Sequence, residues 1–261
     1  MRSPIIGRVM RTPLAWLGTM LLATATLAVP AGAVTQSWNG YKWARTGLLT
    51  IGVGNNLTGA WSPYLTSAAT DWSADPLIDF KIIKGTSSAS CNAVYGTVQV
   101  CNGNYGANGW LGYAYVWLSG GFIVQGTVRL NDYYFSMPRY NTAAWRSATV
   151  CQELGHTLGL AHIDVIRTNL NLGTCQDYTN DPSGTAGGVN GTKANTRPGA
   201  SDFAALAGIY ATPNSTQLAM TKPQYYIGAG FSIDDNEIET ALTAVPAPST
   251  CRMRLSGAGG G

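Results

Sequence analysis

The sequence predicts a mixed α/β domain whose strands and helices alternate before a longer loop-rich region. Three patterns predict this. Short runs rich in β-branched and apolar residues read as strands, two segments carry apolar residues at helical spacing, and residues 109–132 read as a hairpin. Apolar residues make up 45% of the chain and charged residues only 11%, which suits a globular domain with a core better than a disordered chain.

The N-terminus has the pattern of a secretory signal peptide. Arg2, Arg8 and Arg11 make a basic start, an apolar run from residue 14 to 29 follows, and Ala31-Gly32-Ala33 offers a small-x-small cleavage site. We therefore expect residues 1–33 to be removed and the protein to be secreted and extracellular.

Removing residues 1–33 changes the charge balance of the chain. Of 16 basic and 13 acidic residues, three arginines and no acids are lost, which leaves 13 of each in 228 residues. That length is about one or two domains. A balanced charge gives no support for a nucleic-acid partner, and no later segment is long and apolar enough to cross a bilayer. We expect a monomer that does not bind membranes after signal cleavage.

The first predicted elements are a strand, a helix and a second strand. Residues 48–53, LLTIGV, form the first strand. The next segment places Trp61, Leu65, Ala68 and Trp72 on one helical face, at spacings of four, three and four. Residues 79–83 form the second strand.

A hairpin and a long helix follow. Residues 109–132 contain two aromatic and β-branched strands joined at residues 119–121, Ser-Gly-Gly. Asn141 or Thr142 can cap a helix that runs to about Leu158, and Gly159 can end it by adopting the left-handed conformation.

The remaining chain gives weaker signals. Residues beyond Leu160 are loop-like, and Ser201 or Asp202 opens a short helix with Phe203, Leu206 and Tyr210 as its apolar stripe. No element is predicted after residue 213. The expected organisation is therefore a domain over residues 34–212 and a C-terminal tail over residues 213–261.

Export makes disulfides plausible for the five cysteines. Cys91 and Cys101 bracket a short, hairpin-like segment, and Cys151 and Cys175 lie 24 residues apart. We expect these two pairs to be bonded, which leaves Cys251 unpaired, although spacing alone does not fix connectivity.

The stretch CQELGHTLGLAH, residues 151–162, carries the chemistry. Both histidines of the chain, His156 and His162, lie in it. Residues four apart share a helix face, so positions 152 and 156 can converge on one metal ion, and Glu153 lies beside that face as a candidate general base. A turn at Gly159 would let His162 approach the same point. This pattern predicts a zinc site.

The segment resembles the active-site helix of the metzincin zinc endopeptidases, whose signature is His-Glu-x-x-His-x-x-Gly-x-x-His. The resemblance covers roughly residues 41–212 and includes the aromatic hairpin and the turn LNLGTCQDYTNDP. It implies a twisted, mostly parallel five-stranded sheet above the active-site helix and a small loop-rich C-terminal subdomain. It further implies a Zn²⁺ cofactor and peptide or protein substrates.

Two positions depart from the signature. Gln152 replaces the first histidine, and Gln176 stands where the turn has its methionine. The third ligand is therefore open: the Gln152 oxygen, Asp164 or water can complete a site held by His156 and His162. Tyr178, two residues past Gln176, matches a tyrosine that some metzincins place near the metal to stabilise the transition state.

Three functions follow from these residues. The first is a secreted zinc-dependent endopeptidase with Glu153 as general base and Tyr178 as a second catalytic group. The second is a catalytically impaired, metzincin-like binding protein, which the two glutamines suggest. The third is a secreted carbohydrate-binding domain, which the aromatic, glycine-rich and low-charge composition suggests. Its sugar-stacking face would be formed by Trp110, Tyr113, Tyr115 and Trp117, for which packing in the core and hairpin is the alternative use.

Overall fold

The computed structural model describes residues 36–86, 90–186, 188–213, 223, 225–233 and 238–244. The chain divides into two units, Met1–Gly32 and Ala33–Gly261, and the first lies wholly outside the described residues. The predicted signal peptide over residues 1–33 and Cys251 are likewise outside them.

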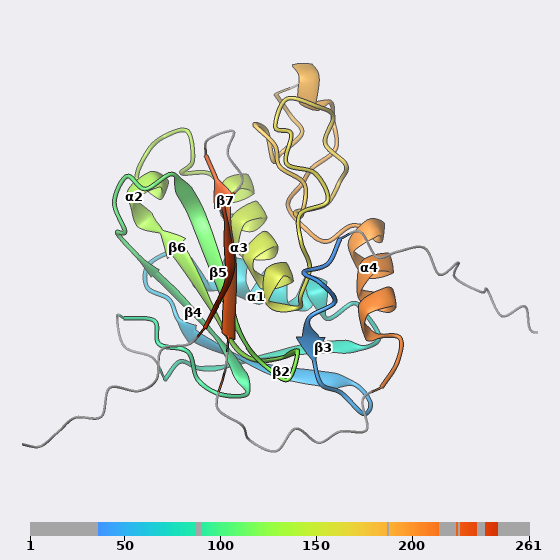
Figure 1. Cartoon of the computed structure of the whole chain (residues 1–261). Coiled ribbons are helices and arrows are strands. Elements are labelled where there is room, and N and C mark those ends of the chain that lie inside the picture. Colours follow the sequence, from blue (N-terminus) through green and yellow to red (C-terminus); the bar gives the residue numbers. More distant parts are fainter. Residues whose placement is uncertain are drawn as a thin grey trace, which may run out of the picture. The chain divides into compact units, whose positions relative to one another are not determined.

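A mixed, mostly parallel sheet forms the centre of this unit (Figure 1). The strands hydrogen-bond in the order β3-β2-β4-β6-β5-β7-β8, and β1 pairs with β6. Pairings on the β3 side of β6 are parallel, whereas β5, β7 and β8 run antiparallel to their neighbours. The strands are β1 Lys42–Trp43, β2 Leu49–Asn56, β3 Ile78–Lys84, β4 Thr97–Gly103, β5 Trp110–Ser119, β6 Phe122–Asn131, β7 Tyr225–Ser232 and β8 Ile238–Ala244.

The sheet differs from the predicted one in two respects. Within the described residues it has eight strands instead of five, because β1 is added on β6 and the segment after residue 213 supplies β7 and β8. The segment bracketed by Cys91 and Cys101 is not a hairpin, since β4 alone forms there and pairs in parallel with β2 and β6. The predicted strands β2 and β3 and the hairpin of β5 and β6 are confirmed.

The helices are α1 Ser62–Trp72, α2 Asp132–Phe135, α3 Ala143–Thr157 and α4 Ala200–Tyr210, with one 3₁₀ turn at Gly188–Asn190. Helix α3 begins where the sequence predicts, since the Thr142 hydroxyl accepts a hydrogen bond from the Trp145 N–H at 3.2 Å. Helix α4 begins slightly earlier than predicted: Gly199 is the N-cap, and Asp202 accepts from its N–H at 2.7 Å. No helix among the described residues is long and apolar enough to span a bilayer.

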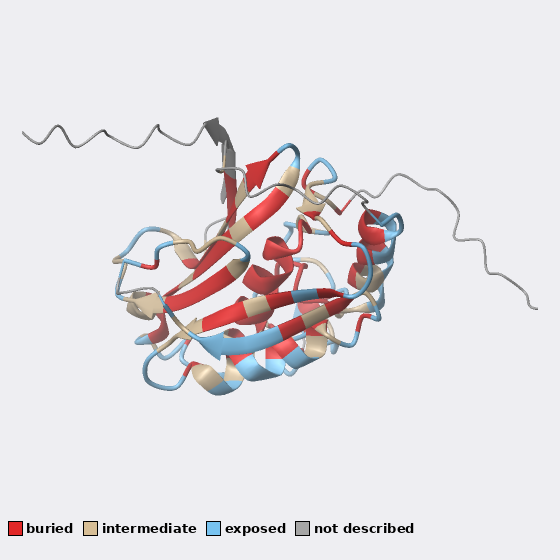
Figure 2. Cartoon of the chain, turned by 90° about the horizontal axis from the view of Figure 1, so that it is seen from below, coloured by how far each residue is buried: buried red, intermediate tan, exposed pale blue. Residues whose placement is uncertain are grey.

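The core lies where α1 and α3 meet each other and the sheet. Figure 2 shows buried residues along these facing surfaces and exposed residues on the outer sides of the elements. Trp61, Leu65, Ala68 and Trp72, the predicted stripe of α1, are all buried. Burying a side chain such as Leu65 contributes roughly 1.5–3 kcal/mol, so packing against α3 and the sheet holds α1 in place.

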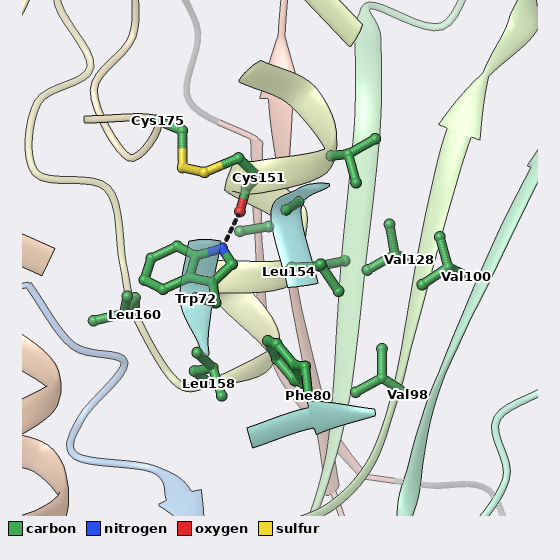
Figure 3. Close-up of a cluster of buried hydrophobic side chains, with 14 of the residues drawn as sticks. Trp72, Phe80, Val98, Val100, Val128, Cys151, Leu154, Leu158, Leu160 and Cys175 are labelled. Carbon is green, nitrogen blue, oxygen red and sulfur yellow. Dashed lines mark hydrogen bonds between the residues drawn. A yellow bond between two sulfur atoms is a disulfide. The ribbon is translucent and has the colours of Figure 1, made fainter. Parts of the chain in front are cut away.

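Both predicted disulfides are present. Cys91 and Cys101 have their Cα atoms 5.8 Å apart, and Cys151 and Cys175 have theirs 5.9 Å apart. The second bond ties α3 to the loop-rich region that follows it. Figure 3 shows Trp72 of α1 beside this bond, with its indole N–H donating to the Cys151 carbonyl oxygen at 2.9 Å.

Candidate active site

Helix α3 carries three of the predicted site residues into the protein interior. Gln152, Glu153 and His156 are all fully buried. Polar side chains are buried at a cost unless a partner compensates them. Each of the three must therefore be explained by its contacts.

His156 is held in one orientation by the chain just beyond the helix. Its Nδ1 lies 2.9 Å from the Leu160 carbonyl oxygen, and since a carbonyl only accepts, Nδ1 carries the proton. The Trp38 ring stacks on the imidazole at a centroid distance of 5.2 Å. Nε2 is buried and has no hydrogen-bond partner among the described residues. Burial, and next the charge of His162, hold the pKa of His156 well below its ordinary value, so it stays neutral and able to bind a metal.

His162 reaches His156 through the turn at Gly159. Gly159 has a φ of +88°, as predicted for the helix end, and a Cβ there would lie 2.0 Å from the Tyr41 carbonyl oxygen. After this turn the two imidazole rings lie 4.6 Å apart between centroids and nearly perpendicular. The motif therefore brings its two histidines together.

Glu153 points from α3 to the strands β5 and β7. Its Oε1 accepts from the Phe231 N–H at 3.0 Å, and the Ala114 backbone also hydrogen-bonds the carboxyl. Gly112 makes room for it, because a Cβ on Gly112 would lie 2.7 Å from Glu153 Oε1. Burial raises the pKa of Glu153 well above its ordinary value, against the effect of these two hydrogen bonds. Glu153 Oε2 has no partner among the described residues.

Gln152 and Gln176, which replace signature residues, each donate a side-chain hydrogen bond to a backbone carbonyl at or next to the other glutamine. Gln152 Nε2 donates to the Cys175 carbonyl at 2.9 Å, and Gln176 Nε2 donates to the Gln152 carbonyl at 2.8 Å. Each side-chain oxygen is buried without a hydrogen-bond partner among the described residues. The Gln152 amide group thus anchors the turn through its nitrogen and leaves its oxygen as a possible metal ligand.

Asp164 is engaged elsewhere. Its Oδ1 accepts from the Ile166 N–H at 2.6 Å and its Oδ2 from the Asn169 side chain, so both oxygens order the loop. Within the described part of the chain, no three His, Cys, Asp or Glu side chains gather as a metal site. The structure thus brings His156 and His162 together and does not add Asp164 to them.

Tyr178 lies beside the histidines and is buried. Its ring is 4.6 Å from the His162 ring and stacks on Phe231 at 5.2 Å with an interplanar angle of 10°. The Tyr178 hydroxyl accepts from the Ser232 N–H at 3.4 Å. The residues fit a zinc ion in kind, since His156 and His162 supply two neighbouring imidazoles and the Gln152 amide oxygen has no hydrogen-bond partner among the described residues.

Three residues of this region were not predicted. Phe231 and Ser232 of β7 contact Glu153 and Tyr178, and Arg167 donates to the Ser232 carbonyl oxygen. The only available signal was the aromatic and apolar run YYIGAGFS at residues 225–232, which suits a strand. Nothing in that run indicates which strand it joins.

Neither the protein-family models nor the curated proteins contain a match to this chain. Among solved structures, one described as the structure of myroilysin is 14% identical and has a TM-score of 0.39; the match covers 68% of this chain and 99% of that one. A second, described as the crystal structure of myroilysin, is 17% identical with a TM-score of 0.34 and covers 66% and 86% of the two chains.

Proposed function

We propose that the protein is a secreted zinc-dependent endopeptidase. The observation that carries the proposal is the contact between the His156 and His162 rings, next to the helix that also carries the buried Glu153. His156 is held by the hydrogen bond from Nδ1 to the Leu160 carbonyl, and its buried Nε2 has no partner among the described residues. A histidine ligand is typically oriented by such a hydrogen bond from its other ring nitrogen.

His156 and His162 would hold the metal, and the Gln152 oxygen is the third candidate ligand. It shares a helix face with His156 and has no other described partner. An amide oxygen is a weaker zinc ligand than imidazole, so we expect lower affinity than three histidines would give. Asp164 is a poorer candidate because the loop already uses both its oxygens.

Glu153 is suited to move a proton. A bound zinc ion supplies Lewis-acid chemistry that polarises a peptide carbonyl and strengthens water as a nucleophile. Glu153 would accept the proton of that water on its carboxylate and pass it to the leaving nitrogen. Its burial raises its pKa, which makes it a better base than an exposed carboxylate. Tyr178 would donate a hydrogen bond to the oxyanion.

The two alternatives are less well supported. A catalytically impaired, metzincin-like binding protein has no need of the buried carboxylate of Glu153 on the helix that carries His156. For carbohydrate binding, the rings of Trp110, Tyr113, Tyr115 and Trp117 do form a row, with successive centroids 5.9, 4.6 and 6.1 Å apart. All four are buried or partly buried and pack on one another, which favours a packing role.

Metal analysis of the purified protein tests the proposal directly. We expect about one zinc ion per chain in the wild type and its loss in both His156→Ala and His162→Ala. Melting temperatures with and without added zinc check that loss of metal is not loss of fold. Stoichiometric zinc in both folded variants would falsify the site, and peptide cleavage that resists strong chelators would refute the zinc mechanism.

A further inference from the structure

Strand β7 covers the open side of β5, directly over Glu153. The two strands pair antiparallel from Trp110↔Ser232 to Leu118↔Tyr225, and Figure 1 shows β7 alongside β5 near α3. Extended peptides commonly bind proteins by adding a strand to a sheet edge in this way. Without β7, the edge of β5 would be the place beside Glu153 where a peptide could add.

The end of β7 engages the proposed catalytic groups one by one. Phe231 donates its N–H to Glu153 at 3.0 Å, and its ring stacks on Tyr178 and meets Trp145 edge-on at 5.7 Å. Ser232 donates its N–H to the Tyr178 hydroxyl, and its carbonyl accepts from Arg167. Phe231 and Ser232 therefore hydrogen-bond to the proposed proton acceptor, Glu153, and to the phenol of Tyr178.

The strands are shaped to let β7 approach closely. The β5–β7 register shifts between Trp110 and Gly112, next to the point where Phe231 bonds Glu153 instead of continuing a regular ladder. Gly228 of β7 lies against the tyrosines of β5, and a Cβ there would be 2.6 Å from Tyr113 and 2.8 Å from Tyr115. Gly228 therefore permits the close approach of β7 to β5, and Gly112 leaves room for the Glu153 side chain that Phe231 contacts.

We propose that β7 occupies, within the same chain, the position of an extended peptide substrate and thereby keeps the intact protein inactive until β7 is displaced. The inference rests on the proposed function for its consequence, but the occupancy itself can be tested separately. The proposed occupant is the segment 225–232, with the Phe231 side chain seated between Tyr178 and Trp145.

Cutting the connection to β7 tests this. A recognition sequence for a specific protease is inserted after Pro213 of the full chain, with an uncleavable version of the same insert as the matched control. A short tether holds a segment at roughly millimolar effective concentration. Cutting it at micromolar protein should therefore let β7 leave and raise both peptide binding and peptide hydrolysis by about tenfold or more.

Binding and hydrolysis are read separately. The binding probe is a fluorescent octapeptide with the sequence of residues 225–232, YYIGAGFS. It should bind the cut chain and not the uncut one, and a peptide with Phe231→Ala should bind more weakly than one with Ile227→Ala. Binding after cutting without hydrolysis would support the occupancy and refute the endopeptidase. Equal probe binding before and after cutting would overturn the occupancy, whatever hydrolysis does.

A variant of the uncut chain guards against unfolding on cleavage. Phe231→Ala removes the ring contacts that hold β7 in place and should raise probe binding several-fold. Phe231→Leu keeps an apolar side chain at this position, and its probe binding should stay closer to that of the wild type. Circular dichroism at the assay temperature establishes that both are folded. Folded Phe231→Ala that binds the probe no better than the wild type would contradict the proposal.

Discussion

At the scale of single residues, Glu153 has the environment of a proton acceptor. It is fully buried, lies on the helix that carries His156, and receives backbone hydrogen bonds on a carboxylate whose pKa is raised by burial. An amide in its place keeps the shape and the acceptor for Phe231 but cannot take a proton.

Glu153→Gln should therefore greatly reduce peptide hydrolysis and leave zinc binding unchanged. We expect zinc content equal to the wild type and a fall in hydrolysis of roughly 100- to 10,000-fold, the usual contribution of a general base. Both are measured on the protein cut after Pro213, so that β7 does not mask the effect. Hydrolysis at the wild-type rate would assign the proton transfer to another group.

Gln152 is the second residue whose role one substitution can decide. Gln152→His should raise zinc affinity, because an imidazole nitrogen replaces an amide oxygen on the face that carries His156. Competition with a chromophoric zinc chelator measures the change, and Gln152→Ala serves as the control, with affinity below the wild type. If all three proteins bind zinc equally, residue 152 is outside the ligand set.

At the scale of elements, the site depends on the contact between α3 and the turn after it. Three kinds of interaction hold this contact: the Cys151–Cys175 disulfide, the side-chain hydrogen bonds of Gln152 and Gln176, and the hydrogen bond from Trp72 of α1 to the Cys151 carbonyl. Gly155 allows this contact, since a Cβ on it would lie 2.1 Å from Gln176 Nε2 and 2.6 Å from Trp72.

Gly155→Ala should push the turn away from α3 and destabilise the fold. Overpacking of a buried contact typically costs about 1–3 kcal/mol. Gly47→Ala is the matched control, because a Cβ on Gly47 meets nothing within 4 Å, and we expect a change within about 0.5 kcal/mol there. Denaturant unfolding compares the two. Equal unfolding midpoints for the two variants would show that the turn can move to accommodate the added methyl group without a loss of stability.

At the scale of the whole molecule, Asp177 links stability to pH. Its carboxylate accepts from the Leu172 N–H at 2.8 Å and the Asn195 side chain at 2.7 Å, joining separate parts of the loop-rich region. Burial outweighs these bonds and raises its pKa from 3.8 to about 6. The folded protein therefore binds more protons than the unfolded chain between these values, and stability from this group falls as pH rises from 3.8 to about 6.

Asp177→Asn imitates the protonated side chain and should remove this dependence. We expect the variant and the wild type to be similar near pH 4, and the variant to be more stable by about 1–2 kcal/mol above pH 7, allowing for solvent screening. Urea unfolding across pH 4 to 8 measures the difference. A constant difference across that range would mean that Asp177 does not titrate on unfolding.

Local sequence patterns were enough to predict several elements of this protein and the meeting of its two histidines. The period of the apolar residues predicted α1, the Thr142 cap and Gly159 bounded α3, and the Ser-Gly-Gly turn predicted the β5–β6 hairpin. The motif spacing brought His156 and His162 together, because helix geometry and one left-handed glycine suffice for that. Such features depend on neighbours in sequence, so the sequence alone was enough.

Pairing between distant segments was decided only by the tertiary structure. The sequence gives no indication that β4 pairs in parallel with β2 and β6, or that β7 joins the edge of β5, because any apolar strand can satisfy the backbone of any other. The contact between Phe231 and Glu153 joins residues 78 positions apart. It forms because β5 and β7 both lie against α3, where a buried carboxylate needs hydrogen-bond donors and the edge of β5 needs a partner strand.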